Sequence, residues 1–229
     1  MFTIFPELVR CARAYDEERL ALLAHRYFGS GEPLKTRTQY EEMLTKAGII
    51  LCYETSLDSY GTLLIRDERV PMSPVICVRK DLDWMEQKFL IAMFLGRFLF
   101  DHQVKIVSRS SKLLSIREIQ SPYLRFLLSK RPRHSQLSML GSRMEWLSDE
   151  FAGAFLLPKQ WLRTFVEEEK DPLRIAAHFS VSLDFLHARI KHIRQKFQGT
   201  LYNSHHKGHH ANSPLARIRD HARKIDPSP

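Results

Sequence analysis

Hydrophobic and polar positions along the chain predict a helical protein with a small sheet. Apolar residues recur mostly at spacings of three and four from Glu7 to Phe28, which predicts a helix that ends at the following Gly-Ser-Gly. A second helix is expected from Thr36 to Ala47, because Gly48 follows it as a C-terminal stop. Three short apolar runs have the length and composition of strands: Ile49–Tyr53, Gly61–Ile65 and Pro74–Val78.

The stretch from Trp84 to Asp101, WMEQKFLIAMFLGRFLFD, has no Pro and a single Gly and is rich in Leu, Phe and Met. This composition predicts a buried amphipathic helix. Asp81 and Asp83 precede the stretch, and either side chain suits the N-terminal cap. The predicted fold class is therefore α+β, with a sheet of about three strands packed on a mostly helical body.

The second half of the chain is more basic and less regular. Residues 102–135 are rich in Ser and Arg, which fits either a solvated insertion or a surface for nucleic acid or another acidic partner. A short helix is expected from Lys159 to Glu168, and residues 171–193 have helix-turn-helix spacing. We therefore expect one domain over 1–196, with the helix-turn-helix-like part at 171–194. A flexible, basic, His-rich tail is expected over 197–229.

Length and composition are those of a globular protein without a membrane span. The chain has 229 residues, 44% of them hydrophobic, and a net charge of +9. Its longest apolar run, Phe89 to Phe100, contains Arg97 and is too short to cross a bilayer, and the first residues lack a signal-peptide pattern. The three Cys have no metal-ligand spacing, so free thiols in a reducing cytoplasm are the expectation.

The centre of the predicted helix resembles a degenerate zinc-peptidase motif. Its sequence Ala92-Met-Phe-Leu-Gly-Arg97 aligns with A-H-E-L-G-H, in which two His one helical turn apart bind Zn²⁺ and the Glu is the general base. Met93 and Arg97 replace the two His, and Phe94 replaces the Glu. A thioether is a poor ligand for zinc, a guanidinium repels it, and Phe94 can exchange no proton. We therefore predict no catalytic residue, no bound metal and no cofactor at this site.

A second window lies downstream in the order that a known family shows. The sequence from Glu145 to Pro158 resembles E-x-x-A-N-x-F-A-x-x-L-L-M-P, the second motif of the ImmA/IrrE family of metallopeptidases. Ser148 stands for the Ala and Asp149 for the Asn, whereas the Glu is kept. The resemblance covers roughly Ile49 to Ile193. It implies a minimal zincin-like peptidase fold in which Glu145 is the vestigial third zinc ligand.

The family resemblance also implies a setting. Members with intact motifs are typically cytoplasmic enzymes that relieve repression by cutting a helix-turn-helix repressor. In this chain the Glu145 carboxylate would face the former metal position without a cation, which is costly when buried. We therefore predict an ion pair between Arg97 and Glu145, with Met93 and Phe94 filling the remaining space. His102, expected just beyond the helix, is a candidate stray metal ligand, although a helix-end His that binds a carbonyl is more usual.

Four functions are compatible with these patterns, and the leading one is a cytoplasmic pseudo-peptidase that binds a regulatory protein, such as a helix-turn-helix repressor. The alternative from another class is a nucleic-acid-binding regulator that uses the basic segments 105–133 and 189–224. Its expected phosphate contacts are Arg131, Arg133, Arg189, Lys191 and Arg194. An unusual hydrolase that uses His102, Glu145 and a tail His is a third reading, and a small-molecule sensor in the vacated pocket is a fourth.

Overall fold

The computed structural model describes residues 5–65, 73–104, 112–116, 143–168 and 171–204, with side chains left undescribed at 65, 101–104, 112–116, 143–145 and 197–204. The chain divides into two compact units, Met1–Ile190 and Lys191–Pro229. The larger unit ends six residues before the domain boundary expected from the sequence. None of the helices in the described part of the chain has the length and apolarity that a bilayer crossing requires.

The predicted first helix is in fact two helices, α1 (Pro6–Ala14) and α2 (Glu17–Tyr27). Tyr15 takes a left-handed conformation with φ 55°, which ends α1, and the Asp16 carboxylate then accepts a hydrogen bond from the Arg19 amide to begin α2. The apolar pattern is interrupted here by the polar residues 16–19, and the prediction of one helix overlooked this gap and the capping Asp16. Helix α3 (Arg37–Lys46) begins with a capping box between Thr36 and Gln39.

The described strands form a four-stranded sheet in the order β1-β3-β2-β4. Strands β1 (Ile50–Glu54), β2 (Gly61–Ile65) and β3 (Val75–Arg79) are those predicted, and β1 pairs with β3 in parallel. The additional strand β4 (Lys112–Ile116) pairs antiparallel with β2. This strand lies inside the basic stretch that was expected to be an insertion or a binding surface, so part of that stretch belongs to the sheet.

Two of the three cysteines form a disulfide, so the prediction of three free thiols is wrong. Cys52 and Cys77 are directly opposite in the β1–β3 register, with their Cα atoms 4.7 Å apart, and their sulfur atoms are bonded. Cys11 remains a free, buried thiol. No local pattern indicates this pairing, because it depends on which strands become neighbours.

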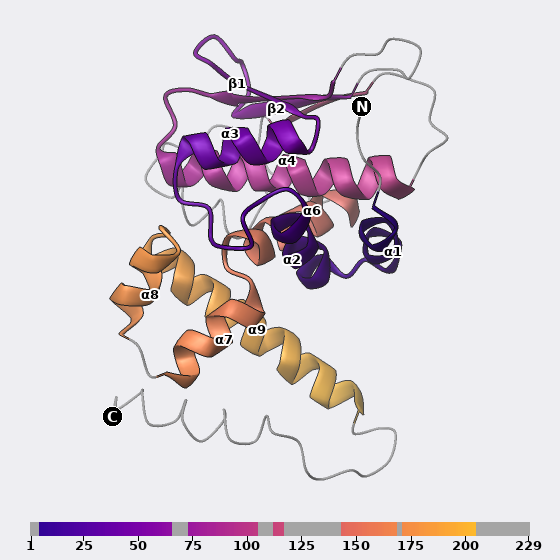
Figure 1. The fold of residues 1–229 in the computed structure, drawn as a ribbon. Coiled ribbons are helices and arrows are strands. Elements are labelled where there is room, and N and C mark those ends of the chain that lie inside the picture. The colour runs from indigo at the N-terminus through magenta and orange to yellow at the C-terminus, as the bar shows by residue number, and fades with distance from the viewer. Residues whose placement is uncertain (1–4, 66–72, 105–111, 117–142, 169–170, 205–229) are drawn as a thin grey trace. The chain divides into compact units, whose positions relative to one another are not determined.

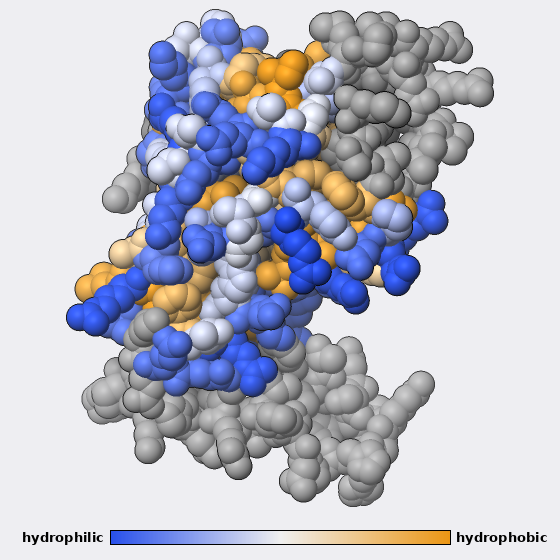
Figure 2. Space-filling view, in the orientation of Figure 1, coloured by the Kyte–Doolittle hydropathy of each residue, from blue (hydrophilic) through white to orange (hydrophobic). Residues whose placement is uncertain are grey.

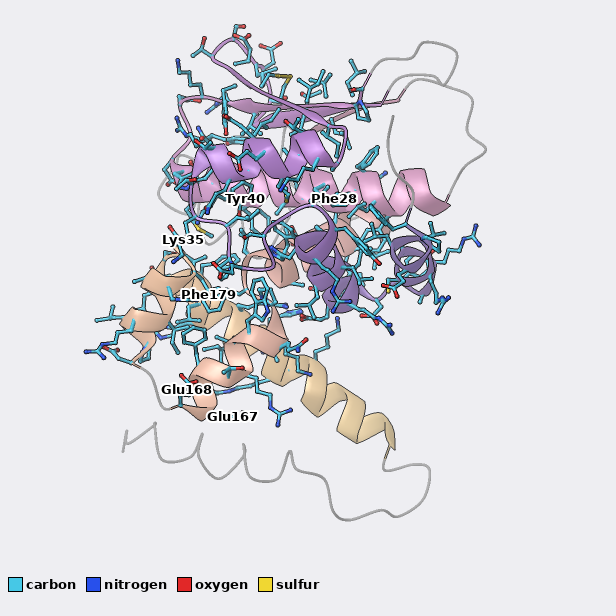
Figure 3. All side chains as sticks on the ribbon, viewed as in Figure 1. Phe28, Lys35, Tyr40, Glu167, Glu168 and Phe179 are labelled. Carbon is cyan, nitrogen blue, oxygen red and sulfur yellow. A yellow bond between two sulfur atoms is a disulfide. The ribbon has the colours of Figure 1, made fainter. Side chains whose placement is uncertain are left out.

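Helix α4 (Trp84–Val104) is the centre of the core and lies between the sheet and helices α1, α2 and α6. Figure 1 shows the sheet along one side of α4, with α1, α2 and α6 (Arg143–Leu156) on the opposite side. Asp83 caps α4, since its carboxylate accepts from the Glu86 amide at 2.8 Å, whereas Asp81 pairs with Arg79 at 2.6 Å. Phe28, Tyr40 and Phe179 (labelled in Figure 3) are among the buried aromatic residues of this unit.

Helices α7 (Lys159–Glu167), α8 (Pro172–His178) and α9 (Leu183–Ser204) follow, and α9 continues across the boundary between the two units. The buried ammonium of Lys88 on α4 donates a hydrogen bond to the carbonyl oxygen of Ser180, in the turn between α8 and α9. Burial lowers the pKa of Lys88 to about 8. This contact fixes the α8–α9 turn to the core helix.

Candidate functional site

The degenerate motif lies in the middle of α4, where its side chains are packed rather than open to solvent. Met93 is 8% exposed and Phe94 is 2% exposed, while Arg97 is half-buried. A Cβ atom added to Gly61 on β2 would lie 2.7 Å from Cε2 of Phe94. Phe94 therefore occupies the space directly beneath the sheet, in close contact with a strand that can only carry Gly there.

The Gly of the motif has a structural role of its own. A Cβ atom added to Gly96 would lie 2.6 Å from Cδ1 of Phe151 on α6, closer than real Cβ contacts allow. Gly96 therefore permits the close approach of α4 and α6, the two helices that carry the two motif windows. The glycine of the sequence that resembles the zinc motif therefore serves the packing of α4 on α6 in this structure.

The residues at the family's metal position do not fit a zinc ion. A thioether and a guanidinium stand where the motif has its two imidazole ligands, so two of the donors that tetrahedral zinc requires are missing, and a phenyl ring stands where the motif has its general base. Within the described residues, no group of three or more His, Cys, Asp or Glu could hold a metal ion. Met93, Phe94 and Arg97 therefore cannot support metal-assisted hydrolysis in the way the intact motif does.

Two residues of the predicted site have side chains outside the described part. Glu145 lies in the first turn of α6 and His102 in the last turns of α4, so His102 belongs to the helix and not to the segment beyond it. The Arg97–Glu145 ion pair therefore stays a prediction. Arg131 and Arg133 lie wholly outside the described residues.

The second motif window places polar groups inside the protein. Ser148, Asp149 and Glu150 follow one another on α6, and none is more than 4% exposed. All three interact with neighbouring groups, as buried polar side chains must to offset the loss of water. Because three successive residues point to different sides of a helix, their burial shows that the protein encloses α6 on more than one side at this turn.

The segment that carries this window matches a known family. Residues 138–191, about a quarter of the chain, match the model of the IrrE N-terminal-like domain, peptidase family M78. The predicted resemblance to the ImmA/IrrE family is confirmed over this segment. The predicted α+β class is confirmed as well, by a mostly helical unit with a small mixed sheet.

Two further comparisons do not identify a function for this chain. No curated protein sequence matches it. A solved structure described as a Mycobacterium tuberculosis transcriptional regulator is similar at 20% identity and a TM-score of 0.35, over 79% of this chain. The chain spans 45% of the length of that protein. A TM-score this low does not establish a common fold.

In the helix-turn-helix-like segment, one of the predicted phosphate contacts, Arg189, is buried. Arg189 was expected to bind phosphate, but its side chain is 1% exposed and forms an ion pair with Glu18 on α2. Its Nε also donates to the carbonyl oxygen of Leu157 at 3.3 Å. Arg189 therefore joins α9 to α2 and cannot reach a nucleic acid. Lys191 and Arg194, later on α9, are exposed.

Sequence reasoning missed a buried histidine. His25 on α2 is 1% exposed and stacks on Phe155 of α6, with ring centroids 4.1 Å apart. Its apolar neighbours in sequence made it look like one position of an ordinary helix face. Its partner is 130 residues away, so no local pattern could have indicated the contact.

Proposed function

We propose that this chain is a pseudo-peptidase, a regulatory module that binds a partner protein without cutting it. The observation that supports this most strongly is the replacement and burial of Met93 and Phe94 in the middle of α4. The expected partner is a helix-turn-helix repressor, the substrate class that the family resemblance implies. The proposed location is the cytoplasm, where such repressors act.

This chain has the packing contacts of the predicted peptidase fold but lacks the residues for its chemistry. Packing of α4 on the sheet and on α6 depends on Gly61, Phe94, Gly96 and Phe151, all of which form close contacts. The chemistry depends on ligands and a base, which this chain lacks at the matching positions. Retention of packing without chemistry supports a role that needs the fold and its surface rather than hydrolysis.

Metal analysis of the purified protein tests the loss of chemistry. We expect less than one zinc in ten molecules for the wild type after dialysis against zinc, because Met93 and Arg97 cannot replace two imidazoles. The double variant Met93→His with Arg97→His restores two ligands one turn apart and should bind zinc, with Glu145 as the third ligand. Met93→Leu with Arg97→Gln is the matched control. Stoichiometric zinc in the wild type would contradict the proposal.

A second measurement tests partner binding. The full chain is mixed with a helix-turn-helix repressor encoded beside it, and the complex is followed by size-exclusion chromatography while the repressor is followed by mass spectrometry. The proposal expects a complex in which the repressor stays intact over hours, with or without added zinc. Cleavage of the repressor, or failure of the two proteins to associate at micromolar concentration, would remove the pseudo-peptidase reading.

A nucleic-acid-binding regulator remains the second candidate, and one observation favours it. Helix α8, the turn over 179–182 and the long α9 have helix-turn-helix order, and α9 exposes Lys191 and Arg194. A salt-dependent gel shift that weakens in the double variant Lys191→Gln with Arg194→Gln would support it, with a salt slope reduced by about two. The absence of any shift at low salt would exclude it.

A further inference from the structure

The disulfide between Cys52 and Cys77 lies on the outer face of the sheet, where solvent can reach it. Cys77 alternates along β3 with Ile76 and Val78, whose side chains are buried and therefore face the core. Cys77 points to the opposite face, together with Cys52 in the same register. Both cysteines are partly exposed, and Figure 3 shows the bond on the side of the sheet away from α4. A thiolate in solution can therefore approach the sulfur atoms.

Strand β1, which carries Cys52, is held less firmly than its neighbour. It lies at one edge of the sheet, so among the described strands it pairs with β3 alone. None of its residues is buried, and Ile50 at its start is exposed, whereas β3 has two buried residues. Side-chain packing therefore contributes less to holding β1 than to holding β3. Local opening of such a strand requires less free energy than global unfolding.

The disulfide joins this edge strand to the sheet at its centre. Cys52 is the middle residue of β1, and the register places it opposite Cys77, the middle residue of β3. With the bond closed, the two strands cannot separate at this point. With the bond open, the backbone hydrogen bonds and partial burial alone keep β1 in place. Exposed disulfides are also the ones that exchange readily with thiols and that serve as regulatory bonds.

We propose that the Cys52–Cys77 disulfide is a redox-responsive link, which fixes β1 when it is closed and lets β1 open locally when it is reduced. The cytoplasmic location proposed above favours this role, because disulfides in that compartment are usually transient and redox-sensing. Solvent exposure and the position on an edge strand support it in any compartment. The proposal is independent of the pseudo-peptidase function and of nucleic-acid binding.

A reductant that carries two thiols opens the link by thiol–disulfide exchange. One thiolate of the reductant attacks the sulfur of either cysteine, the bond between the two sulfur atoms breaks, and the other cysteine leaves as a thiolate that takes up a proton. The second thiol of the reductant then attacks the mixed disulfide. This step releases the remaining cysteine as a thiol and the reductant as a disulfide. The protein gains two electrons and two protons, and the reverse exchange with the oxidised reductant closes the link.

The third cysteine provides an internal reference for this reaction. Cys11 on α1 is a free thiol, it is buried, and burial raises its pKa. It should therefore react with an alkylating reagent only when the protein opens around α1. Local opening of β1 exposes Cys52 and Cys77 to the reagent and leaves Cys11 protected, whereas global unfolding exposes all three.

Thiol labelling of the oxidised, full-length protein tests the proposal without any variant. The protein is incubated at neutral pH in native buffer with dithiothreitol, a reductant with two thiols, and iodoacetamide labelling of each cysteine is followed by mass spectrometry. We expect Cys52 and Cys77 to become labelled together, at least about tenfold faster than Cys11. Labelling of all three cysteines at one rate would overturn the proposal. Labelling of Cys52 or Cys77 before dithiothreitol is added would also overturn it, because the thiols would then be free.

Hydrogen–deuterium exchange measures how β1 responds. Amides of residues 50–54 should exchange at least about tenfold faster in dithiothreitol, whereas amides of residues 89–100 in α4 should keep their rates. The double variant Cys52→Ser with Cys77→Ser should show fast exchange in β1 with or without the reductant, and Cys11→Ala is the matched control that keeps the wild-type response. The comparison within the wild type stands even if the double variant fails to fold. Equal exchange of β1 in the oxidised and reduced wild type would show that the bond does not control this strand.

Discussion

The buried face of α4 and a cavity beside α2 belong to the same unit but differ in character. The first is closely packed and apolar, whereas the second is open and lined by polar residues. On α4, the positions that matter in an active relative carry Met93 and Phe94, and close packing fills the space around them. Beside α2, no family motif is present, yet the buried His25 has an acceptor, Nδ1, without a partner among the described residues. The difference teaches that a segment that resembles a motif can serve packing alone, while a region without any motif can hold a buried polar group.

Part of the molecular surface over the sheet is apolar. Figure 2 shows apolar residues gathered over the sheet on the face that is displayed, and Ile50 on β1 is 52% exposed. The cavity region is different, because Arg19 and Arg26 are exposed there. Five predictions follow the contrast between the packed core and the polar cavity region, from the largest expected effect to the smallest.

Gly96→Leu should have the largest effect, because its side chain would overlap the ring of Phe151. Overpacking at this contact should lower the free energy of unfolding by at least about 3 kcal/mol. Urea denaturation provides the measurement, and Ala177→Leu, at an exposed position of α8, provides the control. Phe151→Ala should partly rescue Gly96→Leu. If Gly96→Leu has wild-type stability, the close helix contact is absent.

Reduction of the Cys52–Cys77 disulfide should destabilise the sheet above α4. The bond joins residues 25 positions apart, and loop closure of this length contributes about 3 kcal/mol. Dithiothreitol should lower the urea midpoint of the wild type but not that of the double variant Cys52→Ser with Cys77→Ser. Cys11→Ala should keep the full response to dithiothreitol, because Cys11 is a free thiol. An unchanged midpoint in the wild type would show that the thiols are not joined.

His25 should make stability depend on pH below neutrality. Its pKa falls from 6.5 to about 4 on folding because the ring is buried, so the unfolded chain takes up a proton first as the pH falls. Stability should therefore be lost between about pH 6.5 and pH 4, by about 3 kcal/mol in total. Comparison of urea midpoints across this range should show a smaller slope in His25→Phe. Equal slopes in both proteins would contradict the buried neutral imidazole.

Arg189→Met should cost about 2 kcal/mol of stability, because Glu18 loses its ion pair and the Leu157 carbonyl loses this donor, although the Lys159 amide still donates to Glu18. The Glu18 side chain is 30% exposed, so the cost is below that of a fully buried pair. Arg194→Gln, at an exposed position on the same helix, should change the free energy of unfolding by less than about 0.5 kcal/mol. Similar small effects from both variants would restore Arg189 as a candidate phosphate contact.

Arg97→Ala should have the smallest of these effects, about 1 kcal/mol, if the predicted pair with Glu145 forms at a half-buried position. Glu145→Gln should cost less, because the amide can still accept a hydrogen bond from the guanidinium. Arg163→Ala removes an exposed arginine from a surface pair with Glu167 and is the control. Melting temperatures that are unchanged in both Arg97→Ala and Glu145→Gln would argue against the ion pair.

Local patterns predicted the elements whose signals lie within a few residues. The β-rich runs became β1, β2 and β3, Gly48 with φ 69° follows α3, and the apolar stretch from Trp84 became α4. The break at Tyr15 was missed because the polar residues 16–19 also fit the solvent face of one continuous helix. Strand β4 was missed because its charged and Ser-rich surroundings hid a five-residue strand that depends on β2 for pairing.

Some features of the candidate site could likewise be predicted from local sequence, and others could not. Its degenerate motif could be read directly, since the i and i+4 spacing of Met93 and Arg97 fixes their common helix face. The burial of Arg189 could not be read, because the charge pattern of α9 is the same whether Glu18 or a phosphate lies opposite. The acceptor on His25 was equally hidden, since it depends on Phe155 and Trp161 far along the chain.

The sequence by itself indicated the family resemblance, the α+β class and the residue types along the central helix, because these follow from residue identity and from spacing within one or two turns. Only the tertiary structure decided which cysteines pair, which arginine is buried and which histidine is enclosed in the core. The physical reason is that burial and hydrogen bonding depend on what lies opposite each side chain. Those neighbours are brought together by packing over long stretches of chain, and no local pattern records them.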